Sequence, residues 1–414
     1  MRKTISFLFY ICLIGMALSS CNSQNAPTPD LALTATSDQA TQTFLCCTAT
    51  PDLSAITPVI SPFPPPNFGP NVILYRGNTQ RTGVYDVPAI RHQPEVKWQT
   101  KVNSTLPTSP LVVEDILYTG SSNGKLYALN IETGEEIWSV GGFGQLENAG
   151  AVSGDVIVSG GYSQDVRALD RRTGSELWSF TTENLIQATP LIVGNRVYIA
   201  TYHAVYALDL NSGSLIWEVE TGDEDAYTGA PAYDAGVIYT TGGKLLLALD
   251  AESGRELWRT EKDEQFLGLA VANGFVYVGN WNKDFYAFDQ VTGEERWKFQ
   301  AEGEIWFPPA VNEDTVYVGN VDTLHALNAQ TGELRWSLKT GGNFVSEPII
   351  AEDVVYMSDG NHETKRGTHH LYALDAITGE ELWVFETVSM FLPAPALGNG
   401  VIYLTSTGEV IAFK

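Results

Sequence analysis

The chain is 414 residues long, and 24 Lys and Arg residues against 49 Asp and Glu residues give it a net charge of −25 at pH 7. No run of more than two basic residues occurs, which excludes an extended basic surface for nucleic acid or anionic lipid. The 18 Tyr, 17 Phe and 10 Trp residues, with 38 Gly and 20 Pro, predict many short strands joined by tight turns. We therefore expect an all-β fold.

Residues 1–20 are predicted to be a lipoprotein signal peptide. Arg2 and Lys3 precede an apolar stretch that ends at Leu18, and the sequence LSSC that ends at Cys21 resembles the lipobox of bacterial lipoproteins. A transmembrane anchor is the alternative, but about fourteen apolar residues are too few to span a bilayer comfortably. We expect Cys21 to be the lipidation site.

Residues 21–70 are rich in Thr, Pro, Ala and Ser and have no periodic pattern that would bury a face. They predict a disordered tether with an average reach of roughly 35–45 Å. Cys46 and Cys47 lie in this tether, and Cys12 lies in the signal peptide. Because no Cys lies among the later residues, we expect the folded core to need no disulfide. A lead-in segment, residues 71–93, follows the tether.

From residue 94 to residue 414 the sequence repeats with a period of about 40 residues. The unit is Ala-[Leu/Phe]-[Asp/Asn]-x-x-[Thr/Ser]-Gly-x-x-x-Trp, which predicts a hairpin whose Asp or Asn caps the turn and whose Gly takes a positive φ. We expect each Trp to dock on the neighbouring repeat. These residues are Trp138, Trp178, Trp217, Trp258, Trp297, Trp336 and Trp383. Four strands per period are typical of one blade of a β-propeller.

The two ends of the repeat region indicate how many blades there are. The last repeat stops at Lys414, before its final strand, whereas residues 94–100, with Trp98, form a final strand with no repeat before it. We expect these two parts to complete one blade, which removes the exposed edges that an open sheet would present. The prediction is a monomeric, eight-bladed β-propeller of four-stranded antiparallel blades, with the last blade closed by an N-terminal strand.

The hairpin with its docking Trp resembles the repeat of pyrroloquinoline quinone (PQQ) dehydrogenases and their non-enzymatic relatives. The resemblance covers residues 94–414, and YRGNTQRTG at 75–83 resembles the lead-in of many PQQ-like repeat proteins. Among lipid-anchored members of this family, BamB serves in the outer-membrane β-barrel assembly machinery. The repeat implies the fold strongly and the function weakly.

The enzymes of this family hold a tricarboxylate cofactor over the propeller axis, which requires cationic side chains and calcium-binding carboxylates near the innermost strands. The eight innermost strands are expected at 108–113, 149–153, 188–193, 229–233, 267–272, 308–312, 346–351 and 393–398. They contain no Lys or Arg, and Glu347 is their only acid. Since a buried, unpaired tricarboxylate is strongly unfavourable, we expect neither PQQ nor calcium to bind.

The sequence offers no other catalytic or metal-binding pattern. Cys46 and Cys47 invite comparison with the vicinal disulfide that stacks on the cofactor in some of these enzymes, but the pair precedes the first blade. A surface disulfide or a second anchoring feature is the alternative for this pair. His-Glu-x-x-His and Cys-x-x-Cys-His are both absent from the sequence. We expect no catalytic residues, no metal site and no enzymatic activity.

A partner is expected at the face where loops enter the innermost strands and where loops join the two middle strands. The candidate partner-binding residues are Tyr227, Phe266, Trp281, Trp306, Phe344 and Phe391. The alternative is that residues at the loop positions of this mouth pack between blades. Trp281 breaks the Trp period, and it is expected either to anchor an interface or to fold back over its own blade.

One repeat has an anomalous length, 47 residues from Trp336 to Trp383, with the excess in residues 359–370. His362, His369 and His370 lie in this insertion, but their spacing matches no known zinc pattern. We expect a solvated loop.

Together these features predict a non-catalytic, lipid-anchored, extracytoplasmic protein that binds a protein partner, with outer-membrane protein assembly as the specific version. Asn22 is not the Asp that typically retains lipoproteins at the inner membrane, so the outer membrane or the cell surface is expected. A small-molecule or glycan binder is the alternative, followed by a PQQ-dependent dehydrogenase.

Overall fold

The computed structural model describes residues 72–104, 108–221, 228–340, 342, 344–360, 369–387 and 394–414. The signal peptide and tether, with Cys21, Cys46 and Cys47, lie outside the described residues, as do Tyr227, Phe391 and the loop 361–368. No helix in these ranges is long and apolar enough to cross a membrane.

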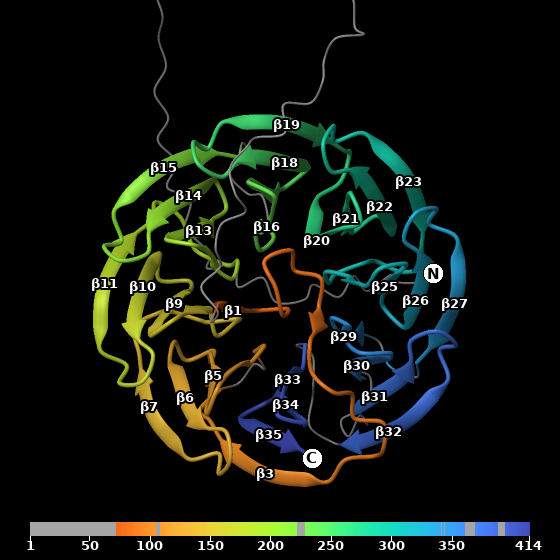
Figure 1. Ribbon diagram of the computed structural model, residues 1–414, viewed down its shortest axis with the longest axis horizontal. Helices are drawn as coiled ribbons and strands as arrows, with labels where there is room; N and C mark the ends of the chain where they lie inside the picture. Colours follow the sequence, from red (N-terminus) through yellow and green to blue (C-terminus); the bar gives the residue numbers. More distant parts are fainter. Residues whose placement is uncertain are drawn as a thin grey trace, which may run out of the picture. The chain divides into compact units, whose positions relative to one another are not determined.

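Eight antiparallel blades of four strands each stand around a central axis, which confirms the predicted eight-bladed β-propeller (Figure 1). The innermost strands are β4 (Leu111–Val113), β8 (Ala151–Ser153), β12 (Leu191–Val193), β16 (Ala232–Asp234), β20 (Phe266–Ala272), β24 (Ala310–Val311), β29 (Ile349–Ala351) and β33 (Ala396–Gly398). The second strands are β5 (Ile116–Thr119), β9 (Val156–Gly160), β13 (Arg196–Ala200), β17 (Val237–Gly242), β21 (Phe275–Asn280), β25 (Thr315–Gly319), β30 (Val354–Gly360) and β34 (Val401–Ser406).

The third strands are β6 (Leu126–Asn130), β10 (Asp165–Asp170), β14 (Ala204–Asp209), β18 (Leu245–Asp250), β22 (Asp284–Asp289), β26 (Thr323–Asn328), β31 (His369–Asp375) and β35 (Glu409–Phe413). The outer strands, from blade 1 to blade 8, are β7 (Glu136–Val140), β11 (Glu176–Thr181), β15 (Leu215–Glu220), β19 (Glu256–Glu261), β23 (Glu295–Gln300), β27 (Leu334–Lys339), β32 (Glu381–Thr387) and β3 (Val96–Lys101). Three short additional strands are β1 (Val72–Leu74), β2 (Val84–Tyr85) and β28 (Phe344–Val345).

Because the strands of a blade alternate in direction, the loops gather at two faces. We call the end that carries the turns between third and outer strands the hairpin face, and the opposite end the loop face. The turns between inner and second strands also lie at the hairpin face. The loops that enter the inner strands lie at the loop face, together with the loops between second and third strands.

The repeated hairpin and the repeated Trp form one contact between successive blades. The φ of Gly213 is +70°, and a Cβ added there would lie 2.6 Å from Cε3 of Trp178 in the preceding blade. The Asp209 carboxylate accepts hydrogen bonds from the backbone N–H groups of Asn211 and Ser212, which holds the turn. Glycine is therefore required at this position for two reasons, the backbone conformation and the close approach of the indole.

Seven of the eight repeat Trp residues also donate their indole N–H to a backbone carbonyl of the next blade, at 2.7–3.2 Å. The donors of these seven bonds are Trp98, Trp138, Trp178, Trp217, Trp258, Trp297 and Trp336. The eighth, Trp383, faces a blade whose last hairpin is missing. It donates instead to the carbonyl of Ile90, at 2.9 Å, so the end of the lead-in replaces the absent hairpin.

Blade 8 is assembled from both ends of the repeat region. The strand order is β3-β35-β34-β33, and Trp98 in β3 lies opposite Ala412 in β35. Glu95 and Lys414 exchange two backbone hydrogen bonds of 2.8 Å beside this pair. The ring is thus closed by hydrogen bonds as well as by packing, as the sequence predicted.

Candidate functional site

The lead-in occupies the centre of the ring, which the sequence did not predict (Figure 1). Strand β1 pairs antiparallel with β8 of blade 2, and β2 pairs parallel with β29 of blade 7. The segment between them, residues 75–83, turns across the axis. Its conformation needs positive φ values at Arg76, Gly77, Arg81 and Gly83, which explains the two glycines of this motif.

Two arginines of the lead-in are buried at the axis, each with 1% exposure. Arg81 donates four hydrogen bonds of 2.8–3.2 Å, and the acceptors are the carbonyls of Tyr75, Thr189, Pro190 and Pro231. Burial lowers the pKa of Arg81 to about 10, so it remains protonated at neutral pH. Arg81 therefore fastens the lead-in to blades 3 and 4 with charge-assisted hydrogen bonds.

Arg76 makes the matching contacts on the other side of the axis. Its guanidinium donates to the carbonyls of Arg81 and Pro309, and it forms an ion pair of 3.4 Å with Glu347 of blade 7. The hydroxyl of Tyr75 donates to the same Glu347 carboxylate. Burial, and next the charge of Glu347, raise the pKa of Tyr75 well above its usual range, so the phenol stays protonated.

These contacts bring cations to the axis from outside the inner strands, which the sequence did not predict. The inner strands lack Lys and Arg, but the lead-in brings in Arg76 and Arg81 from outside the repeats. Their hydrogen bonds go to backbone carbonyls and to the single acid, Glu347. Within the described ranges, the guanidinium groups of both arginines are thus already hydrogen-bonded within the protein.

At the loop face, Trp281 and Trp306 lie together between blades 5 and 6. Trp281 is in the turn between β21 and β22, Trp306 is in the loop that enters β24, and their ring centroids are 6.0 Å apart. Both side chains are partly exposed. Within the described ranges, the indole N–H of Trp281 has no hydrogen-bond partner. Trp281 therefore packs against the loop of the next blade and keeps part of its ring open to solvent.

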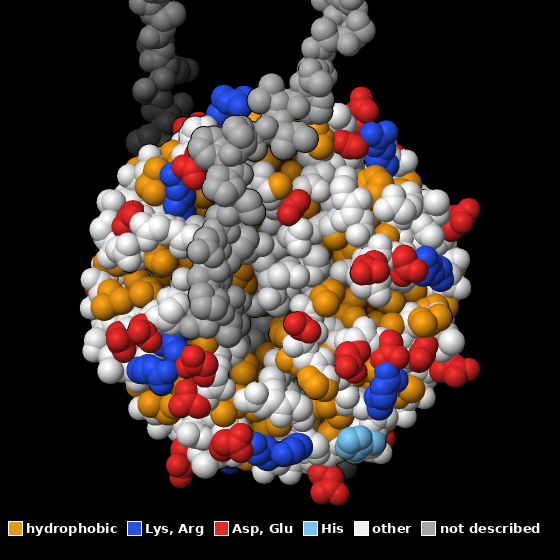
Figure 2. Space-filling view, viewed as in Figure 1, with side chains coloured by type: hydrophobic (Ala, Val, Ile, Leu, Met, Phe, Trp, Pro, Cys, Tyr) orange, Lys and Arg blue, Asp and Glu red, His pale blue; other side chains and the backbone are white. Residues whose placement is uncertain are grey.

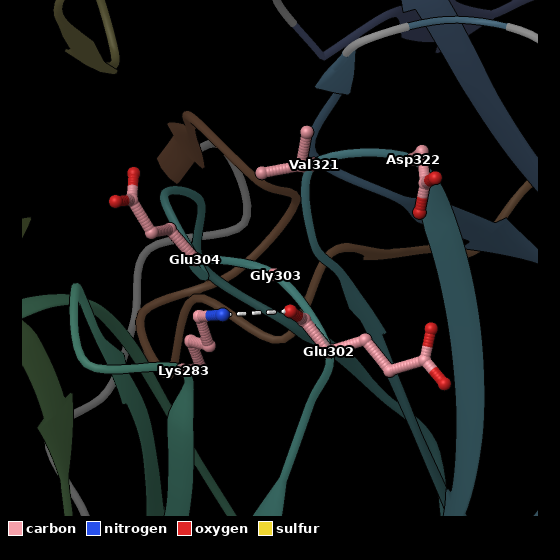
Figure 3. Close-up of a pocket in the computed structure, with 6 residues that line it drawn as sticks. All are labelled: Lys283, Glu302, Gly303, Glu304, Val321 and Asp322. Carbon is pink, nitrogen blue, oxygen red and sulfur yellow. Dashed lines mark hydrogen bonds between the residues drawn. The ribbon is translucent and has the colours of Figure 1, made fainter. Parts of the chain in front are cut away.

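A hollow of about 430 Å³ is lined by the same two loops and by the turn between β25 and β26 (Figure 3). Its lining residues are Lys283, Glu302, Gly303, Glu304, Val321 and Asp322. Lys283 donates to the carbonyl of Glu302 at 3.0 Å, and Figure 3 shows the two glutamate side chains extending away from this bond. Partial burial raises the pKa of Asp322, but bonds from Lys339 and Thr323 outweigh it and leave the pKa below its ordinary value. Three carboxylates and one Lys line the hollow, so it is acidic.

Of the other aromatic candidates, the structure describes only the side chain of Phe266, which does not join Trp281 and Trp306. Phe266 was predicted to bind a partner, and this was wrong: it is fully buried and packs edge-on against Tyr286 and Phe288. Phe344 lies in β28, which pairs with β30, and its side chain is outside the described part. Leu146, Ile186 and Ile305, at the loop positions of this mouth, are buried, as the packing alternative predicted.

The insertion of blade 7 was expected to be a solvated loop, and at its ends this was wrong. Asp359 is fully buried in β30, and its carboxylate accepts hydrogen bonds from the backbone N–H of His370 at 2.9 Å and from the hydroxyl of Tyr372 at 3.1 Å. The Nδ1 atom of His370 lies 3.0 Å from the same carboxylate. In the ranges that the structure covers, no group of three or more His, Cys, Asp or Glu residues is placed to hold a metal ion.

The fold and the site define a class: an eight-bladed propeller with the PQQ-like hairpin repeat, whose axis is occupied by its own lead-in. The family model described as outer membrane protein assembly factor BamB matches residues 76–203, 141–226, 203–307 and 302–414. The chain belongs to this family.

Individual relatives include assembly factors and enzymes. BamB of Nitrosomonas eutropha is 31% identical over 26% of this chain and 27% of the relative, and BamB of Shewanella oneidensis is 23% identical over 54% and 61%. Quinohemoprotein alcohol dehydrogenase ADH-IIG of Pseudomonas putida is 30% identical over 30% of this chain and 21% of the enzyme. The chain thus spans less than two thirds of the length of these relatives.

Solved structures agree on the fold. BamB from Moraxella catarrhalis superposes with a TM-score of 0.61 at 21% identity, over 78% of this chain and 99% of that chain. A quinohemoprotein alcohol dehydrogenase from Comamonas testosteroni superposes with a TM-score of 0.69 at 16% identity, over 81% and 79%. Both likenesses concern the architecture alone, since assembly factor and enzyme share it.

Proposed function

We propose that the protein is a non-catalytic scaffold that binds a protein partner during outer-membrane protein assembly. The observation that carries this proposal is the occupied axis. A PQQ enzyme needs free cationic groups above the axis, whereas Arg76 and Arg81 direct their hydrogen bonds to carbonyls and to Glu347. Membership of the BamB family supports the same proposal.

The partner surface that we propose is the loop face between blades 5 and 6, which we call the Trp site and define by Trp281, Trp306 and the acidic hollow beside them. Partly exposed Trp residues are enriched among the residues that dominate binding energy. Glu302, Glu304 and Asp322 surround Lys283 there, so a basic segment of the partner is the complementary surface. On the face drawn in Figure 2, Lys and Arg side chains are scattered around the rim and do not gather into a basic patch, in keeping with a protein rather than a nucleic acid partner.

The test is cross-linked capture of the full-length protein from its own membranes, with the captured proteins identified by mass spectrometry. We expect a component of outer-membrane protein assembly, and at least tenfold less of it with the Trp281→Ala, Trp306→Ala double variant. The matched control is Val291→Ala, Ile377→Ala, which removes two side chains that are 79% and 78% exposed in hairpin turns. Equal capture by both double variants contradicts the Trp site, and capture of no assembly component contradicts the function.

The enzymatic alternative has its own test. PQQ and Ca²⁺ are added to the purified protein, and cofactor absorbance and alcohol-dependent dye reduction are followed. We expect no change in either signal, because the cationic groups at the axis are already committed. Saturable cofactor absorbance that disappears when Glu347 is replaced by Gln would contradict this expectation.

A further inference from the structure

The lead-in covers the inner strands of some blades and leaves others open. The N–H groups of four inner-strand residues donate to lead-in carbonyls at 2.7–2.9 Å, and the pairs are Tyr233 with Thr79, Val271 with Gln80, Val311 with Thr82, and Ile350 with Gly83. All four donors hold the same register opposite the second strand of their blade. At this position of an antiparallel pair the N–H points away from the partner strand, here toward the axis.

Blades 1 and 8 present the same backbone position without this partner. Val112 lies opposite Leu117 and Leu397 lies opposite Ile402, which is the register of the four donors. Across the part of the chain that the structure describes, neither N–H meets an acceptor. With respect to the described residues, the inner edges of β4 and β33 are therefore open strand edges that face the axis.

A cavity of about 320 Å³ lies against these two edges. The lead-in supplies its other wall through Leu74, Tyr85 and Val87, and the remaining lining residues are Gly77, Asp86, Leu111, Val112, Glu114, Ala396, Leu397, Gly398 and Asn399. Glu114 and Asn399 belong to turns between inner and second strands, so the cavity opens at the hairpin face. It lies at the opposite face from the Trp site.

We propose that this cavity binds a short extended peptide segment of a protein partner, which adds as a strand to the open edge of β4 or β33 and buries one apolar side chain. The protein itself already contains one strand added to an inner strand in this way. Residues Val72, Ile73 and Leu74 form β1, which pairs in this manner with β8, the equivalent inner strand of blade 2. Strand addition of this kind takes its affinity from main-chain hydrogen bonds and its selectivity from pockets for alternate side chains.

The lining residues decide the chemistry of the occupant. Two outward N–H groups require carbonyl acceptors, and aliphatic walls require an apolar side chain. No Lys or Arg lines the cavity, Glu114 is already paired with Arg171 at 2.6 Å, and Asp86 at the rim is negative. A free terminal carboxylate or another anion is therefore disfavoured, and an internal or basic segment fits. This inference is independent of the proposed function, because it uses another face and other residues.

The probe for the test is acetyl-Val-Ile-Leu-amide, a copy of β1, added at millimolar concentration to the full-length protein. Hydrogen–deuterium exchange is followed by mass spectrometry on fragments that contain β4 and β33, with β16 and β29 as internal references. In the free protein we expect β4 and β33 to exchange faster than the references. The peptide should slow both of them at least threefold and leave the references unchanged.

The control peptide is acetyl-Val-Pro-Leu-amide, which keeps the apolar ends but removes a backbone donor and fixes one φ, and we expect at least tenfold weaker binding. Leu397→Trp, which fills the cavity, should abolish the effect, with Val112→Phe as a second variant if the first fails to fold. Leu382→Trp, on the exposed outer strand of blade 7, should leave it intact. Three results overturn the proposal: no slowing by the probe, slowing that survives both filling variants, or β4 and β33 already protected in the free protein.

Discussion

Replacement of Arg81 by Ala tests whether the lead-in is a structural part of the propeller. Arg81 is 1% exposed and donates to four carbonyls from three separate segments of the chain. A hydrogen bond to a charged group contributes about 1.5–3 kcal/mol, but removal of the cation also removes its desolvation penalty. Truncation of one member of a buried charged network generally costs about 3–5 kcal/mol, and this is the expected loss in the free energy of unfolding.

The assay is urea denaturation followed by Trp fluorescence, supported by thermal unfolding, where a loss of this size corresponds to a Tm lower by about 4–8 °C. The matched control is Arg259→Ala, because the Arg259 side chain is 55% exposed and pairs with Glu256 of the same strand. That variant should change stability by no more than about 1 kcal/mol. A loss below about 1 kcal/mol for Arg81→Ala would refute the reasoning, since the lead-in would then lie in the axis without holding the blades.

Three further predictions concern the hairpins, the loop face and blade 7. Gly213→Ala should lower the free energy of unfolding by about 2 kcal/mol or more in denaturant titrations, because it combines a positive φ with a clash against Trp178. Burial lowers the pKa of His325 below its ordinary value of 6.5. Because the unfolded chain then binds the proton at a higher pH than the folded protein does, stability should fall as pH drops through about 6.5. His325→Phe should flatten this fall in melting curves between pH 7 and 5. Asp359→Asn should cost about 1–3 kcal/mol in thermal unfolding, since the amide cannot accept every bond from His370 and Tyr372, and an unchanged Tm would contradict this role for the buried carboxylate.

The fold could be predicted from the sequence because of the repeat. Each period carries its own turn residue, its own glycine and its own Trp, so seven copies reinforce one interpretation. The composite blade was predictable for the same reason, because Trp98 keeps the 40-residue spacing to Trp138 without a hairpin before it. Local patterns of this kind need no knowledge of which distant residues meet.

The axis could not be derived in this way, because its contacts join residues far apart in the chain. Arg81 meets Pro231 across 150 positions, and Arg76 meets Glu347 across 271. The only local signal was a pair of arginines and a pair of glycines in a segment outside the repeats, and it was used to recognise the family rather than to place the residues. The prediction for Phe266 was wrong for a related reason. Its sequence position put it at the mouth, but its side chain turns into the space between blades.

The order of contacts along the lead-in bears on the size of the ring. The carbonyls of Thr79, Gln80, Thr82 and Gly83 meet blades 4, 5, 6 and 7 in that sequence, so five consecutive residues span four consecutive blades. A ring with one blade more or fewer would present its inner strands at a different angular spacing, and these acceptors would no longer face the donors. The lead-in therefore favours a ring of eight blades over a ring with one blade more or fewer. Similar repeats without such a segment would not make this distinction by themselves.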